Sequence, residues 1–151
     1  MCSDLKQDIL DSIEDVDDLL TTYALLLDSV KQSEPDKVEL AALGTVLHSF
    51  YNGVEGIFLY VSKQVDNDTP SDSAWHQSLL SRITEPTGDR THLITPDTAA
   101  VLAPYLKFRF FFRHSYAFML DWKRMKPLVD ELNTTWNVAK ADILSFCDSI
   151  S

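Results

Sequence analysis

Hydrophobic residues recur every three or four positions through three long segments of the chain, which is the spacing of amphipathic helices. The first segment shows the pattern at Leu5, Ile9, Ile13, Val16, Leu20, Tyr23, Leu27 and Val30. Only four glycines and six prolines occur among 151 residues, so long uninterrupted helices are possible. No segment alternates apolar and polar residues as a half-buried strand does. The sequence therefore predicts an all-α fold.

Prolines and polar clusters divide this pattern into separate helices. The first ends near Pro35, because proline disfavours helical geometry in the residue before it. Pro96 suits the first position of a helix, and Pro127 predicts a kink near the start of the last one. The predicted helices cover about residues 5–32, 38–65, 74–83, 96–112 and 121–149. We expect one domain over residues 1–151, folded as an antiparallel four- to five-helix bundle.

Charge is unevenly distributed along the chain. The net charge is −10, which argues against indiscriminate binding to nucleic acid, because phosphate contacts need Lys and Arg. Residues 1–18 carry seven acids and one base, whereas residues 107–126 carry six bases and one acid. The basic segment allows local RNA binding. A few solvated surface cations beside an acidic first helix are an equally good interpretation.

Several classes of site and location are not indicated. No apolar run is long enough to cross a bilayer, and the N-terminal residues do not resemble a signal peptide, so we expect a cytoplasmic protein. Cys2 and Cys147 match no metal-ligand spacing, and we expect two free thiols in a reducing cytosol. The sequence contains no glycine-rich phosphate loop and no serine or cysteine nucleophile motif. We expect no metal and no cofactor.

The most informative segment is residues 107–116, in which Arg109, His114 and Tyr116 are separated by four residues and by one residue. This spacing resembles the Arg-x4–6-His-x-Tyr motif of the HEPN ribonucleases in their HepT-like branch. Residues 49–58, 75–80 and 120–128 resemble further segments of that family, in the same order. The four segments together cover much of the chain from about Phe50 onward.

The resemblance implies a HEPN-like bundle that acts as a homodimer. It implies a metal-independent endoribonuclease toxin that cleaves tRNA or mRNA and does not act on DNA. Arg109 would bind the scissile phosphate, and His114 would act as general acid or base. Tyr116 matches the tyrosine that a partner antitoxin, a minimal nucleotidyltransferase, modifies with AMP. Arg113 and Lys107 are interpreted as auxiliary contacts to RNA phosphates.

These residue types suit RNA cleavage without metal. The 2′-hydroxyl attacks the adjacent phosphorus, histidine suits the proton transfers near neutral pH, and arginine holds phosphate oxygens through fixed donors. On a regular helix Arg109, Arg113 and Tyr116 share a face, while His114 lies about 140° from Arg109. Either the helix breaks near Phe112, or the site forms between two copies of the segment. The resemblance implies the second arrangement.

Other interpretations of the chain remain open. One alternative is a non-catalytic binding module for a nucleotidyltransferase, and another is an unrelated helical dimer in which Arg109 and His114 only pack. The first helix is a candidate surface for the antitoxin.

Several other side chains have less certain roles. Glu55 either pairs with Arg109 or Arg113 or lies on a solvated face. For the aromatic run Phe108, Phe110, Phe111 and Phe112 we expect core or dimer contacts rather than base stacking. We expect Trp122 and Trp136 in the core, His76 packed or at the surface, and no recognisable partner for His48 or His92.

Overall fold

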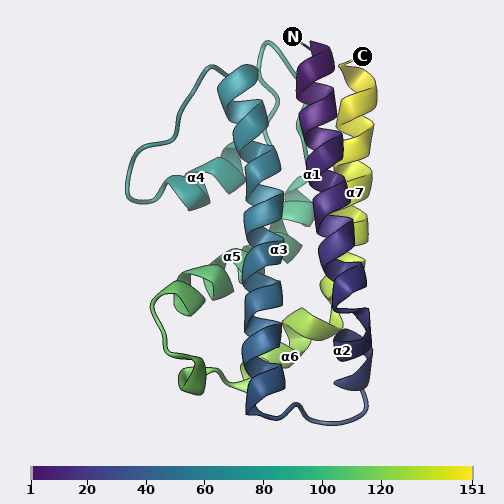
Figure 1. Ribbon diagram of the computed structural model, residues 1–151. Helices are drawn as coiled ribbons and strands as arrows, with labels where there is room; N and C mark the ends of the chain where they lie inside the picture. Colours follow the sequence, from purple (N-terminus) through teal and green to yellow (C-terminus); the bar gives the residue numbers. More distant parts are fainter. Residues whose placement is uncertain (1, 151) are drawn as a thin grey trace.

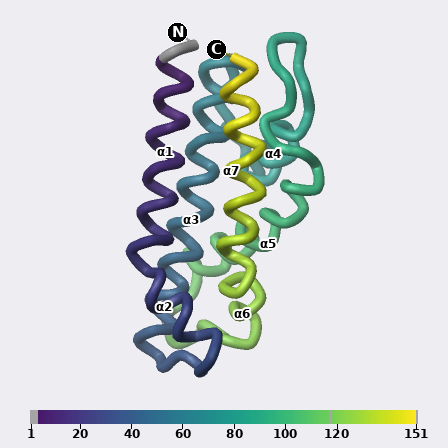
Figure 2. Tube along the Cα trace, turned by 90° about the vertical axis from the view of Figure 1, so that its right-hand side faces the viewer, coloured from purple at the N-terminus to yellow at the C-terminus, as the bar shows by residue number. Residues whose placement is uncertain are grey.

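The computed structural model describes residues 2–150, except for the side chains of residues 2, 3 and 117. The predicted all-α fold is confirmed, because the chain is 74% helical and the described part contains no strand. The long helices α1, α3 and α7 run side by side, and α4 and α5 lie to one side of them (Figures 1 and 2). The elements are α1 (Cys2–Thr22), α2 (Ala24–Ser29), α3 (Lys37–Gln64), α4 (Trp75–Arg82), α5 (Pro96–Arg113), the short 3-10 helix η1 (Ala117–Met119), α6 (Trp122–Asp130) and α7 (Leu132–Ser149).

Helix α3 is the central element, and it contacts α1, α2, α4, α5 and α6. Its start is fixed by a capping box: the Asp36 carboxylate accepts a bond from the Glu39 backbone N–H, and the Glu39 carboxylate accepts one from that of Asp36. Its buried apolar side chains belong to one hydrophobic cluster that extends from Leu5 to Cys147. The residues that α3 contributes to the candidate site are therefore held on a rigid support.

Two helices predicted as continuous are each divided in two. The first is interrupted at Tyr23, and the last bends at Glu131 rather than at its start near Pro127. The bend at Glu131 follows the packing, since α6 contacts α3 whereas α7 contacts α5 and α1. One straight helix could not direct its apolar side toward both surfaces. The helix count therefore exceeds the four to five expected.

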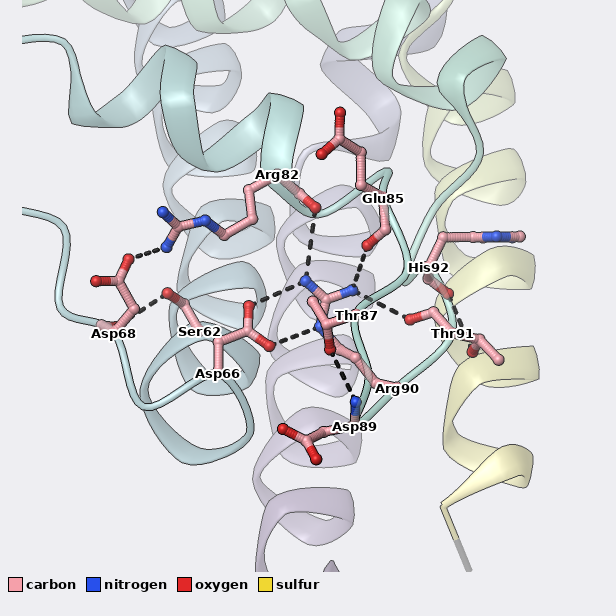
Figure 3. Close-up of polar contacts among 10 residues, drawn as sticks. All are labelled: Ser62, Asp66, Asp68, Arg82, Glu85, Thr87, Asp89, Arg90, Thr91 and His92. Carbon is pink, nitrogen blue, oxygen red and sulfur yellow. Dashed lines mark hydrogen bonds and ion pairs between the residues drawn. The ribbon is translucent and has the colours of Figure 1, made fainter.

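A buried arginine fixes the segment between α4 and α5 (Figure 3). Arg90 donates hydrogen bonds of 2.8 and 2.9 Å to the two carboxylate oxygens of Asp66, just after the end of α3. Its guanidinium also donates to the backbone carbonyls of Arg82, Glu85 and Thr91. Buried charges of this kind are stable only when they are paired and fully bonded. The network therefore fixes the C-terminal end of α4 against α3.

No helix within residues 2–150 is both long enough and apolar enough to span a bilayer. Cys147 is a buried free thiol, and burial raises its pKa, whereas the Cys2 side chain lies outside the described residues. Trp136 belongs to the core as expected, and Trp122 is only partly buried against it.

Candidate active site at the end of α5

Helix α5 ends between the two candidate catalytic residues. Arg113 is its last residue, and His114 is the C-cap, with φ −112° and ψ 11°. Tyr116 lies beyond the helix, so the expectation that Arg109, Arg113 and Tyr116 share one helix face is wrong. Of the two arrangements left open by helical geometry, a break close to Phe112 is therefore present within the single chain.

Arg109 is buried, with 8% of its surface exposed, and its guanidinium is directed at α3. Its Nε donates a hydrogen bond of 2.6 Å to Oδ1 of Asn52. Within residues 2–150 the two terminal nitrogens of Arg109 make no hydrogen bond to another side chain. Asn52 thus fixes the guanidinium through one nitrogen and leaves its bidentate edge for another ligand.

The same asparagine determines the protonation of His48. Because the Asn52 oxygen accepts from Arg109, its amide nitrogen lies toward His48 and donates to Nδ1 at 3.3 Å. Nδ1 must then be an acceptor, which places the ring proton on Nε2, an atom that is buried without a partner among the described residues. Burial and the positive charges of Arg109 and Arg113 lower the pKa of His48. His48 is therefore neutral, and the absence of a recognisable partner for it was a wrong expectation.

Glu55 does not pair with Arg109 or Arg113, and neither of the two expectations for it is correct. It is 4% exposed, and its Oε2 lies 2.7 Å from Nδ1 of His76 on α4. The Trp75 ring stacks on His76 with 3.6 Å between ring centroids. His76 is therefore a packed histidine held by a carboxylate.

Tyr51 lies close to both charged groups. Its hydroxyl is buried without a hydrogen-bond partner among the described residues. Burial raises the pKa of Tyr51, the negative charge of Glu55 raises it further, and the positive charge of Arg109 opposes the shift. Asn52 and Glu55 are three residues apart on α3, so the Arg109–Asn52 and Glu55–His76 pairs lie close to each other along this helix.

The remaining predicted site residues are at the surface. His114 is exposed and contacts the Phe110 ring, with 5.1 Å between centroids. Tyr116 is 72% exposed and stacks on Phe118, with 5.5 Å between centroids and 7° between ring planes. Arg113 and Lys107 are also exposed. Within the described residues, no hydrogen bond or ion pair links any two of Arg109, His114 and Tyr116.

The aromatic run serves two purposes. Phe108 is buried and Phe112 is partly buried against α3, whereas Phe110 and Phe111 are exposed. A Cβ atom at Gly44 would lie 2.7 Å from Cε1 of Phe112, so only glycine allows α5 to approach α3 this closely. The expected core contacts are therefore present for Phe108 and Phe112, two of the four phenylalanines.

A family model described as HepT-like protein matches residues 42–150. The chain belongs to the HepT-like family. The match includes His48 and every site residue that follows it, and it confirms the family resemblance seen in the sequence. No curated protein and no solved structure matches the chain. Membership in the HepT-like family suggests a HEPN-type toxin, and such a toxin implies an antitoxin partner.

In this HepT-like chain, the sequence predicts Arg109 and His114 as site residues but does not indicate that Asn52 bonds Arg109. The one available signal was a polar residue within an otherwise apolar stretch of α3. Asn52 and Arg109 are 57 residues apart, so their contact depends on how α5 packs on α3. Among the described residues, no group of three or more His, Cys, Asp or Glu side chains is arranged to hold a metal ion.

Proposed function

We propose that this HepT-like protein is a cytoplasmic, metal-independent endoribonuclease toxin, acting as a homodimer on tRNA or mRNA. The observation that carries the proposal is the buried Arg109, whose guanidinium is fixed by Asn52 with its terminal nitrogens left for a ligand. A preorganised guanidinium stabilises the negative charge that develops on a phosphate during cleavage. An arginine serving only packing would instead be expected to have these donors satisfied within the fold.

The proposed reaction is an internal transfer within the RNA. A neutral His114 accepts the proton of the 2′-hydroxyl, and the 2′-oxygen forms a bond to the adjacent phosphorus. The bond between phosphorus and the 5′-oxygen breaks, and a protonated His114 gives its proton to that oxygen. The products are a 2′,3′-cyclic phosphate and a 5′-hydroxyl. Arg109 holds the phosphate throughout.

Two histidines are needed at once, and a homodimer supplies them. His114 is exposed at the end of α5, so the same residue of a second copy can approach the same phosphate. The loop that follows carries exposed apolar side chains at Phe118 and Met119, which a second copy would cover. Arg113 and Lys107, both exposed, are proposed as auxiliary contacts to the RNA backbone.

Regulation is proposed to act through Tyr116. Its hydroxyl belongs to a highly exposed ring beyond the end of α5, where a nucleotidyltransferase antitoxin can transfer AMP to it. The attached AMP would add negative charge beside Arg113 and His114 and repel the phosphates of the substrate. The acidic face of α1 is a candidate docking surface for the antitoxin.

The test is cleavage of total cellular RNA by purified protein in EDTA. The unmodified protein should cut RNA, and the His114→Ala variant should not. His92→Ala is the matched control, because His92 is an exposed histidine in the loop before α5 and should be dispensable. Mass spectrometry establishes beforehand that Tyr116 carries no AMP.

Failure of the unmodified protein to cleave RNA would contradict the proposal and favour a non-catalytic binding module for the nucleotidyltransferase. Equal cutting by the His114→Ala variant would leave the nuclease class standing and remove His114 from its mechanism.

A further inference from the structure

A groove of about 1060 Å³ runs between α4 and α5. Small side chains such as Ala99 and Ala103 line it, together with the exposed rings of Phe110 and Phe111. Its volume is at the upper end of the range typical of small-molecule sites. Apart from the auxiliary phosphate contact of Lys107, the mechanism proposed above does not use this groove.

The groove also contains a histidine held in one orientation. His76 lines it, and the buried carboxylate of Glu55 engages Nδ1 of this ring. The second ring nitrogen, Nε2, is therefore the polar atom that His76 can offer to a ligand. A buried carboxylate that bonds one side of an imidazole fixes the ring for contact on its other side.

We propose that this groove binds one nucleobase of the RNA, next to the cleaved bond. This proposal rests on the proposed function. A planar base would stack on Phe110 or Phe111, while His76 and the exposed Gln77 bond to its edge. Lys107, which also lines the groove, would contact the adjoining phosphate.

The position of the groove relates it to the cleavage site. Phe110 lines the groove and contacts the His114 ring, with 5.1 Å between centroids. A base stacked on Phe110 therefore lies beside the residue proposed to move the proton. The groove would choose which nucleotide is presented to His114, and so would determine specificity.

The polar lining favours a nucleobase over an apolar helix of a second copy. An apolar occupant would bury the Lys107 ammonium and the Gln77 amide without partners, which is costly. A nucleotide has hydrogen-bond acceptors for both groups. A second copy seated in the groove is the main competing occupant, and the experiment below distinguishes it.

The experiment measures RNA binding with cleavage removed. Fluorescence anisotropy is recorded for the four eight-nucleotide homopolymers with the His114→Ala protein, and then with each second substitution added to it. We expect one homopolymer to bind most tightly. Phe110→Leu should weaken its binding by about fivefold or more, the lower end of the loss for a stacking aromatic. Gln77→Ala and His76→Gln should reduce the preference among the four bases.

The controls separate this proposal from misfolding. Gln77 is exposed, so Gln77→Ala should not disturb the fold, and the amide of His76→Gln keeps a donor for Glu55. His92→Ala, added in the same background, should change neither affinity nor preference. Circular dichroism checks that each variant is helical.

Equal affinity for all four homopolymers, unchanged by any of the substitutions, would overturn the proposal. So would conversion of the protein to a monomer by Phe110→Leu with no change in RNA affinity, because a second copy would then occupy the groove. Binding is measured without cleavage, so failure of the unmodified protein to cut RNA contradicts the nuclease proposal alone.

Discussion

Replacing Arg90 by Met should destabilise the protein strongly. The Arg90 side chain is 0% exposed and that of Asp66 is 7% exposed, so the substitution leaves a buried carboxylate without its cation. Removing one partner of a buried ion pair costs about 3–5 kcal/mol. For a chain of this size each kcal/mol lowers Tm by about 2–4 °C. We therefore expect Tm to fall by about 6–20 °C, measured by circular dichroism at pH 7.

The matched control is Arg82→Met in the same region of the fold. Arg82 pairs with Asp68, but both side chains are 43% exposed, and such pairs contribute less than about 1 kcal/mol. Both variants remove one positive charge and introduce the same side chain, so a net-charge effect cancels between them. Similar losses of Tm in the two variants, or a loss below about 2 °C for Arg90→Met, would refute the reasoning that burial decides the cost.

Three further predictions concern α3. The pKa of His48 is lowered from 6.5 in the folded state, so its contribution to stability is present above that pH and is lost as pH falls. His48→Gln should therefore lose less stability between pH 7 and pH 5 than the unmodified protein does in urea denaturation. Asn52→Leu removes a bond to a charged group worth about 1.5–3 kcal/mol, so kcat/KM for RNA should fall about 10- to 100-fold, with Asn52→Asp less affected. Gly44→Ala should lower Tm, because the new Cβ atom clashes with Phe112. Gly56 has open space around it, so Gly56→Ala should raise the free energy of unfolding by up to about 1 kcal/mol.

Local sequence signals were sufficient for the helix boundaries that depend on caps. Helix α3 begins and ends within one residue of the predicted range, and its start is set by the local capping box of Asp36 and Glu39. The bends at Tyr23 and Glu131 were not predicted, since both positions lie within continuous apolar spacing. The bend at Glu131 depends on which neighbouring helix each half contacts, which no local pattern contains.

The candidate site shows the same division. Arg109, His114 and Tyr116 were proposed as site residues from their spacing along one segment, but the side chain that bonds Arg109 comes from another helix. Asn52 is 57 residues from Arg109, and Glu55 is 21 residues from His76. The sequence offered Arg109 or Arg113 as partners for Glu55, because unlike charges attract. The fold instead uses a neutral amide for Arg109 and a histidine for the buried carboxylate.

The three motif residues differ in how firmly the fold holds them, and this order suits a regulated nuclease. Arg109 is buried and bonded to α3, His114 caps the end of α5, and Tyr116 is exposed beyond it. A phosphate-binding cation benefits from preorganisation, because a fixed donor needs no rearrangement as charge develops. Under the proposed regulation, Tyr116 must instead be reached by another enzyme without unfolding the site. Because α5 ends at Arg113, Arg109 lies within the rigid helix, whereas Tyr116 lies beyond it and is accessible.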